Sequence, residues 1–129
     1  NLVSLEASAI ELVKIHPNNN VIIHTNHYTA DKMKKLEANP FLNQSISRLS
    51  RASLLANNFL KSKELSIESI KAILSDHQDY PDSFCKHSGS YTKVETLASV
   101  IINLSKKTML VSSGNPCENE YIEYNINSF

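Results

Sequence analysis

The sequence predicts an α+β fold in which antiparallel sheets are covered by helices. Three observations predict this class. β-favouring segments stand at both ends of the chain, a helical block separates them, and several of the β segments are apolar on both faces. Only antiparallel neighbours can be joined by very short connections, and strands that are apolar on both faces need cover on two sides. The pattern therefore indicates layers of helix, sheet, sheet and helix.

Length and composition limit the possible classes of protein. A chain of 129 residues with 41% hydrophobic content is the size of one domain. Thirteen basic and thirteen acidic residues cancel, so no net charge attracts the chain to nucleic acid or to an anionic membrane. No apolar run approaches the roughly 18 residues of a membrane span. We expect one domain over residues 1–129, with no nucleic-acid partner and no membrane span.

The first block predicts three short strands in an antiparallel meander. Residues 2–5 and 10–15 favour β structure, and the second segment ends in the turn-forming cluster at 16–20. Residues 21–25 follow at once and are apolar on both faces. This third strand should be buried on both sides, and it leads directly to the polar side chain of Asn26.

The middle block predicts three helices. Thr29 is a candidate N-cap for a helix over residues 31–38, which closes before Pro40. The longest helix should run over 44–61, because its apolar residues recur on one stripe. A third helix should begin at Ser66 and run to about residue 77.

The last block predicts a second meander. Residues 96–104 form a strand with apolar side chains on both faces, and a polar turn at 105–107 leads to a strand over 109–111. Residues 121–126 alternate in the manner of a further strand. The strand over 96–104 should also be buried on both sides.

Residues that bind metals form no recognisable set in the sequence. His24 and His27 are the closest pair of histidines, and their offset places them on opposite faces of a strand. Cys85 and Cys117 lack a metal-ligand spacing, and the surroundings of Cys85 and His87 do not supply the base and electropositive setting of a thiol catalyst. We expect no metal and no other cofactor, and we expect loop or packing roles for both cysteines.

Two polar residues border apolar stretches. The amide of Asn26 must find hydrogen-bond partners, either in the protein or in a ligand. The guanidinium of Arg48 lies beside the apolar stripe of the long helix, where it either reaches water or is held inside by carboxylates and carbonyls. The pattern alone favours structural roles for both.

Three short motifs occur in a suggestive order. They are T-N-H-Y at 25–28, S-I-S-R-L-S-R-A at 45–52, and G-N-P-C at 114–117 followed by Y-I-E-Y at 121–124. Together they resemble the C-terminal half of the isopenicillin N acyltransferase family of linear-amide C–N hydrolases, which is related to choloylglycine hydrolases and penicillin V acylases. The resemblance spans nearly the whole chain.

The resemblance implies part of a four-layered αββα N-terminal-nucleophile sandwich. In such enzymes a precursor cuts itself to expose a Cys, whose thiolate attacks an amide or thioester carbonyl while its own α-amino group acts as base. This chain starts at Asn1, and neither Cys85 nor Cys117 matches the nucleophile. The resemblance thus implies a C-terminal portion that is inactive alone. Its partner would be a missing N-terminal segment or separate chain that bears the nucleophile Cys.

The resemblance also implies roles for four residues. Asn26 matches the oxyanion-hole Asn and Arg48 matches the Arg near the nucleophile, which makes both catalytic. His27 and Tyr28 would line the substrate pocket, with packing roles as the alternative. The implied substrate is a small acylated amine or amino acid. The rival hypothesis is a noncatalytic binding or structural protein that retains the αββα sandwich.

Overall fold

The computed structural model describes residues 2–128 and contains both helices and antiparallel sheets, which confirms the α+β class. The chain divides into two compact units, Asn1–Ser53 (unit 1) and Leu54–Phe129 (unit 2). No helix in the described part of the chain combines the length and apolar character that a bilayer crossing requires.

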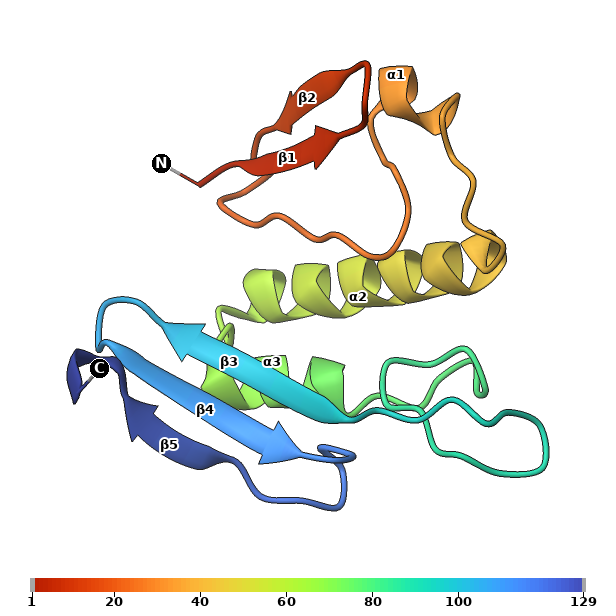
Figure 1. Ribbon diagram of the computed structural model, residues 1–129. Helices are drawn as coiled ribbons and strands as arrows, with labels where there is room; N and C mark the ends of the chain where they lie inside the picture. The colour runs from red at the N-terminus through yellow and green to blue at the C-terminus, as the bar shows by residue number, and fades with distance from the viewer. Residues whose placement is uncertain (1, 129) are drawn as a thin grey trace. The chain divides into compact units, whose positions relative to one another are not determined.

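The sheet of unit 1 is a two-stranded hairpin (Figure 1). β1 (Ser4–Ala7) pairs with β2 (Leu12–Ile15) in antiparallel register. Ser8 closes the connection, because its backbone N–H donates to the carbonyl of Glu11 and its hydroxyl accepts from the N–H of Glu11. The two strands predicted at this end of the chain are confirmed.

The predicted third strand over residues 21–25 is wrong. Val21 makes an isolated bridge with Asn18, across a turn in which Asn19 and Asn20 have left-handed φ values of 49° and 62°. Beyond this bridge the chain follows an irregular path with half-buried isoleucines rather than a doubly buried strand. Side-chain hydrogen bonds to the first turn of the long helix, including the one from Thr25, take the place of a strand ladder.

The first helix is shorter than predicted. α1 covers Asp31–Lys34, and its N-cap is Ala30, which makes no side-chain cap. Thr29, the predicted cap, donates its hydroxyl to Glu6 on β1 instead. The Thr29 hydroxyl therefore makes a tertiary contact with Glu6 instead of capping α1. Met33 is the buried residue of this short helix.

The other two helices form where periodicity and capping predicted them. α2 spans Leu42–Ser62 and includes the predicted 44–61. α3 spans Ile67–Leu74, with Ser66 as its N-cap. Ser66 Oγ accepts from the N–H of Ser69, and Ser69 Oγ accepts from the N–H of Ser66. This reciprocal pair is a capping box, with Ser at the position that Glu usually holds.

The sheet of unit 2 is an antiparallel meander, as predicted. β3 (Ala98–Asn103), β4 (Thr108–Ser113) and β5 (Ile122–Asn125) pair in that order, and the 3-10 helix η1 (Ile126–Ser128) follows (Figure 1). Lys107 takes a left-handed φ of 54° in the β3–β4 turn.

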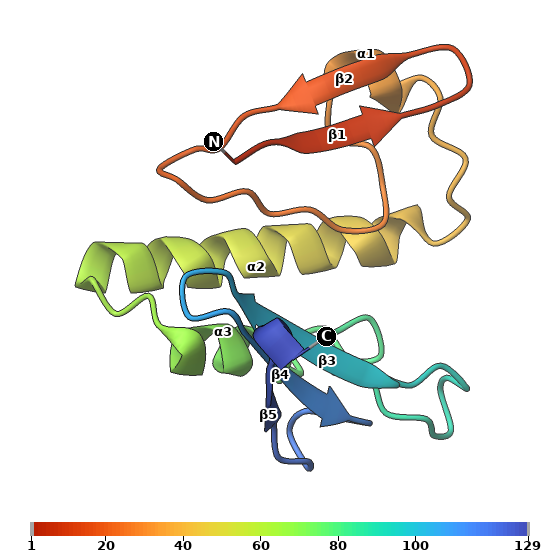
Figure 2. The ribbon, with the colours of Figure 1, turned by 60° about the vertical axis from the view of Figure 1, so that its left-hand side comes forward.

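Among the residues that the structure describes, one face of this sheet is buried and the other is largely exposed. α3 contacts β3 and lies beside it in both Figure 1 and Figure 2. On β3 the side chains of Ser99 and Ile101 are buried, whereas Val100 and Ile102 are 49% and 55% exposed. The prediction that this strand is buried on both sides is wrong for the described residues. The opposite face carries two cross-strand apolar rows, namely Val100, Val111 and Ile122, and Ile102, Met109 and Tyr124.

Candidate functional site

The two residues predicted to be catalytic are in direct contact in unit 1. Arg48, on α2, donates from Nη2 to Oδ1 of Asn26 over 2.9 Å. Asn26 is exposed and Arg48 is half-buried. Because the guanidinium takes the amide oxygen, the Nδ2 group is the donor that Asn26 can present to another molecule.

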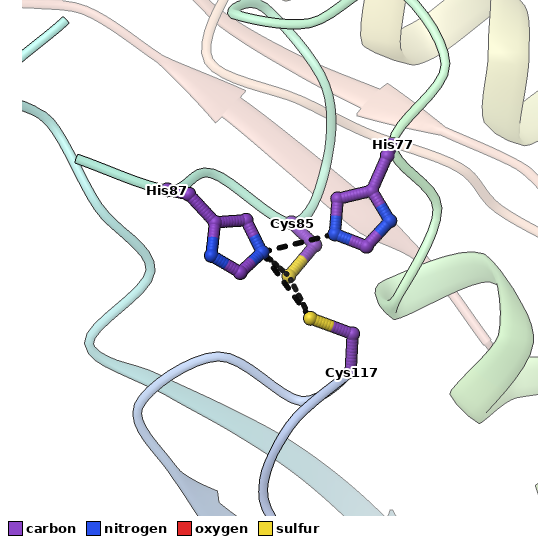
Figure 3. Close-up of side chains that lie close together, drawn as sticks. All are labelled: His77, Cys85, His87 and Cys117. Carbon is purple, nitrogen blue, oxygen red and sulfur yellow. Dashed lines mark hydrogen bonds between the residues drawn. The ribbon is translucent and has the colours of Figure 1, made fainter. Parts of the chain in front are cut away.

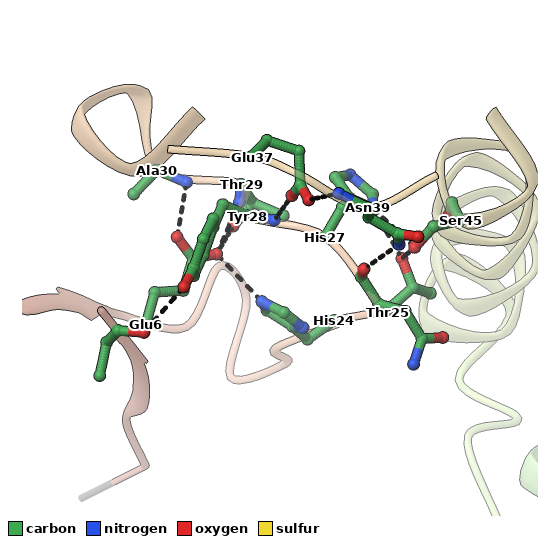
Figure 4. A network of polar contacts seen from close by, with 12 residues as sticks. Glu6, His24, Thr25, His27, Tyr28, Thr29, Ala30, Glu37, Asn39 and Ser45 are labelled. Atoms are coloured by element: carbon green, nitrogen blue, oxygen red, sulfur yellow. Dashed lines mark hydrogen bonds and ion pairs between the residues drawn. The ribbon is translucent and has the colours of Figure 1, made fainter. Parts of the chain in front are cut away.

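The residues on either side of Asn26 are clamped to the first turns of α2 (Figure 4). Thr25 Oγ1 donates to the carbonyl of Ser45 over 2.9 Å, and His27 Nδ1 lies 2.8 Å from Ser45 Oγ. Ser45 is fully buried. His27 therefore holds the segment in place.

The backbone around Asn26 is also held by the segment after α1. Asn39 Nδ2 donates to the carbonyl of Asn26. Glu37 accepts the N–H of Tyr28 over 2.7 Å and the N–H of Asn39 over 2.7 Å, and these two bonds lower the pKa of Glu37. The Tyr28 hydroxyl donates to the carbonyl of Ala7 over 2.8 Å, so Tyr28 also ties the segment to β1.

Glu6 is the buried anchor of this network (Figure 4). Its carboxylate accepts the N–H and the hydroxyl of Thr29 over 2.6 and 2.7 Å, the N–H of Ala30 over 3.0 Å, and lies 3.0 Å from His24 Nε2. Burial acts to raise the pKa of Glu6, but these hydrogen bonds outweigh it and lower the pKa to about 2. A carboxylate therefore stays charged inside unit 1.

An open cleft of about 630 Å³ lies beside this network in unit 1. Its size is within the range of small-molecule sites. Asn26, His27 and Tyr28 all contribute to its wall, whereas Arg48 does not. Three of the four predicted site residues therefore line the cleft. The fourth, Arg48, lies outside its wall and donates a hydrogen bond to Asn26.

Sequence reasoning missed Glu6 and Ser45. The sequence holds no signal for Glu6: on β1 its neighbour Leu5 is 56% exposed while Glu6 is only 3% exposed. This is the reverse of what alternation predicts, because a half-buried strand ordinarily turns its Leu inward and its acidic residue to solvent. Ser45 has no signal either, because a small polar residue in a helix is ordinarily exposed.

A second set of polar side chains lies in unit 2. His77, Cys85, His87 and Cys117 come together, although the sequence shows no ligand spacing. Burial raises the pKa of the Cys85 thiol to about 11, and its hydrogen bond with Cys117 acts in the same direction. A thiol that stays protonated at neutral pH is a poor nucleophile. Cys85 is therefore unsuited to attack an acyl group.

Comparison with protein families gives a match over most of the chain. The family model described as acyl-coenzyme A:6-aminopenicillanic acid acyl-transferase matches residues 1–118. A search of curated proteins found no match to the sequence. The matched region includes the Asn26 cleft, α2 and the G-N-P-C motif.

Proposed function

The chain belongs to the acyl-coenzyme A:6-aminopenicillanic acid acyl-transferase family, and from this membership we propose that it is the C-terminal portion of a cysteine N-terminal-nucleophile amidohydrolase or acyltransferase. In this proposal residues 1–129 are part of one four-layered αββα domain. Asn26 donates to the oxyanion of the reaction, and Arg48 keeps Asn26 in place.

The hydrogen bond between Arg48 and Asn26 is the observation that carries the proposal. A primary amide has an acceptor end and a donor end, and either can face a ligand. The Arg48 guanidinium occupies the acceptor end, so the donor end is the one available for a substrate oxygen. The positive charge also polarises the amide, which strengthens Nδ2–H as a donor to a developing negative charge.

The surrounding hydrogen bonds support the same role, because an oxyanion donor must be held in place before the reaction begins. Thr25 and His27 hold the segment on Ser45 of α2, and Asn39 holds the Asn26 carbonyl. One such donor is worth about 3 to 4 kcal/mol of transition-state stabilisation.

The proposed reaction is acyl transfer through a thioester. The Cys thiolate forms a bond to the amide carbon, and the carbonyl oxygen becomes an oxyanion that accepts from Asn26 Nδ2. Collapse breaks the C–N bond, and the amine leaves with a proton. Water or an amine then attacks the acyl-thioester and returns the thiol. In this proposal the nucleophile belongs to an N-terminal segment or a separate chain, since neither Cys85 nor Cys117 matches the nucleophile of the family and neither lines the Asn26 cleft.

Exposed apolar residues support the proposed partner segment. The two apolar rows on the open face of β3, β4 and β5 include Ile122, which is 60% exposed. In unit 1, Leu5 and Leu12 are 56% and 59% exposed on paired strands. Exposed apolar surface is unfavourable in water, and the contiguous rows on β3, β4 and β5 are of the kind that marks an interaction site. In the αββα sandwich that we propose, strands from the partner segment cover the exposed face of each sheet.

The cleft limits the substrate to a small molecule. Its volume of about 630 Å³ holds a small acylated amine or amino acid, and its wall presents Asn26, His27 and Tyr28. Tyr28 has its hydroxyl engaged with Ala7, so it offers the substrate its ring rather than a hydrogen bond. The choice between hydrolysis and transfer depends on which acceptor reaches the acyl-thioester.

Trapping the acyl-enzyme tests the proposal. The full-length protein is mixed with small N-acyl amino acids, quenched in acid, digested and mapped by mass spectrometry. We expect one acyl group on a Cys that precedes residue 1 and none on Cys85 or Cys117. An adduct on either internal cysteine would refute the proposed nucleophile. A full-length protein that carries no adduct with any substrate tried, and releases no amine, would instead fit a noncatalytic protein that retains the sandwich.

A further inference from the structure

Four side chains that bind transition metals converge at one place in unit 2 (Figure 3). One ligand atom from each of His77, Cys85, His87 and Cys117 lies within 4.8 Å of all the others. The residues come from the segment after α3, the segment before β3 and the β4–β5 connection. None of them lines the Asn26 cleft.

Four of the distances within the set are close to those around a single tetrahedral ion. The two histidine Nε2 atoms are 3.0 Å apart, the two sulfurs are 3.4 Å apart, and His87 Nε2 lies 3.2 Å from Cys117 Sγ and 3.6 Å from Cys85 Sγ. Tetrahedral zinc places two nitrogen ligands about 3.3 Å apart and two sulfur ligands about 3.8 Å apart. A binuclear iron–sulfur cluster would need the ligands to lie farther apart, because they bind two different irons.

Hydrogen bonds alone do not satisfy this set. His87 Nε2 faces three neighbours, namely His77 Nε2, Cys117 Sγ and Cys85 Sγ. A neutral imidazole has one acceptor lone pair, so at most one of the three can donate to it well. A cation at the centre instead uses one lone pair from every member of the set.

The tautomer of His87 is fixed in the form that binds a metal. The amide of Asn115 is oriented by its network, in which Nδ2 donates to the carbonyl of Lys86 over 2.9 Å and of Thr96 over 3.2 Å. Its oxygen then accepts the Nδ1–H of His87 over 2.7 Å, and a carboxylate oxygen of Glu118 lies 3.6 Å from the same nitrogen. Nε2 is left unprotonated and turned toward the set. A metal-bound histidine ordinarily has such an outer partner.

The backbone that carries the ligands is already held in place. The N–H of Cys85 donates to the carbonyl of Asp76, beside His77, over 3.1 Å, and Ser83 Oγ donates to the carbonyl of Cys85 over 2.7 Å. Cys117 follows a turn in which Gly114 has a φ of 79°, a conformation that side chains rarely adopt. The ligand positions are therefore supported by hydrogen bonds and by a turn within unit 2.

We propose that His77, Cys85, His87 and Cys117 bind one structural Zn²⁺ ion. Two thiolates and two imidazoles form a ligand set that zinc prefers, and four protein ligands leave no open position for catalysis. The two thiolates balance the charge of the ion, and their protons are released to solvent. The ion ties the segment after α3 to the segment before β3 and to the β4–β5 connection, and it stabilises unit 2.

Metal analysis of the full-length protein tests this site. The protein is loaded with Zn²⁺ under reducing conditions, desalted, and its zinc is measured by elemental analysis. We expect one zinc per chain, and a higher unfolding temperature than after removal of zinc with a chelator. Cobalt substitution should add a thiolate-to-metal charge-transfer absorption. A zinc-free, disulfide-linked Cys85–Cys117 pair as the stable form in this reducing buffer would overturn the proposal, as would stoichiometric iron in place of zinc.

Variants separate a true site from adventitious binding. His77→Gln and Cys117→Ser alter exposed ligands, so the fold should persist while stoichiometric zinc is lost. Asn115→Ala should weaken zinc binding by about 10- to 100-fold through His87. His16→Gln, on an exposed loop of unit 1, is the matched control and should keep full zinc. Zinc content unchanged in His77→Gln and Cys117→Ser, or lost equally in His16→Gln, would contradict the site.

Discussion

Arg48 Nη2 lies 2.9 Å from Asn26 Oδ1, and this hydrogen bond connects α2 to the irregular segment that leads into α1. The bond joins a regular helix to a residue that no secondary structure holds. The orientation of the Asn26 amide therefore depends on a side chain from α2 and on the clamps at Thr25 and His27. Each part of this arrangement can be tested separately.

Replacement of Arg48 tests the positioning of Asn26. Arg48→Lys keeps the charge but loses the planar fork that reaches the amide oxygen, and we expect kcat to fall by roughly ten- to a hundredfold, the worth of one hydrogen bond to a charged group. Arg51→Lys, one turn farther along α2, is the matched control and should keep normal kinetics. Equal kinetics in the two variants would show that Arg48 does not position the site.

The pH dependence of stability tests the Glu6 anchor. The folded protein lowers the pKa of Glu6 from its ordinary 4.5 to about 2. The stabilisation is therefore complete above pH 4.5 and is lost as the pH falls toward 2; it amounts to about 3 kcal/mol at neutral pH.

Urea unfolding at pH 7 and pH 3 measures this contribution. Glu6→Gln should be less stable than the parent at pH 7, and the difference should shrink at pH 3. Glu11→Gln, a change of the same type at the β1–β2 turn, serves as the control. A Glu6→Gln variant that loses no stability at pH 7 would contradict the anchor.

A substitution on the exposed face of the β3–β4–β5 sheet tests whether the partner segment binds there. Val100→Lys places a charge in one of the two apolar rows, where burial against a partner segment makes it costly. We expect this variant to capture much less of the co-expressed N-terminal portion than the parent chain does. Val94→Lys is the control, because Val94 is similarly exposed, at 57% against 49% for Val100, but lies in a loop. Capture that is undiminished by Val100→Lys would place the partner elsewhere.

In the proposed enzyme the nucleophile Cys lies on the N-terminal portion and Asn26 lies on this chain. We therefore predict that residues 1–129 alone are inactive. The purified chain should release no amine from small N-acyl amino acids. Addition of the N-terminal portion with its Cys should produce turnover, and the same portion with that Cys changed to Ala should not. Turnover by the isolated chain, free of any other polypeptide, would be incompatible with the account.

Local patterns predicted the parts of the fold that depend on neighbouring residues. The capping of α3 by Ser66 and the stripe of α2 are encoded within one or two helical turns, and both are found. The irregular path after Val21 was not predictable in this way, because a strand needs a neighbour that the segment does not have among the described residues. The apolar pattern of residues 21–25 predicts burial on both faces, but the described residues cover this segment only in part.

In the candidate site, too, contacts between segments that are distant in the sequence were not predictable. Asn26 and Arg48 were selected by resemblance, and their contact could not be derived from spacing because it joins two separate segments. Cys85 and Cys117 looked unrelated, since the turn at Gly114 and the loop after α3 bring them together only in the folded chain. Glu6 was missed because its hydrogen-bond partners lie in a distant part of unit 1.

The kcat of Asn26→Ala in the complete enzyme tests the central claim most directly. Asn57→Ala, at an exposed position on α2, is the control for loss of an amide. We predict that Asn26→Ala lowers kcat by about 10²- to 10³-fold, the effect of removing one oxyanion donor, while Asn57→Ala has no effect. A kcat for Asn26→Ala equal to that of the unaltered enzyme would contradict the account.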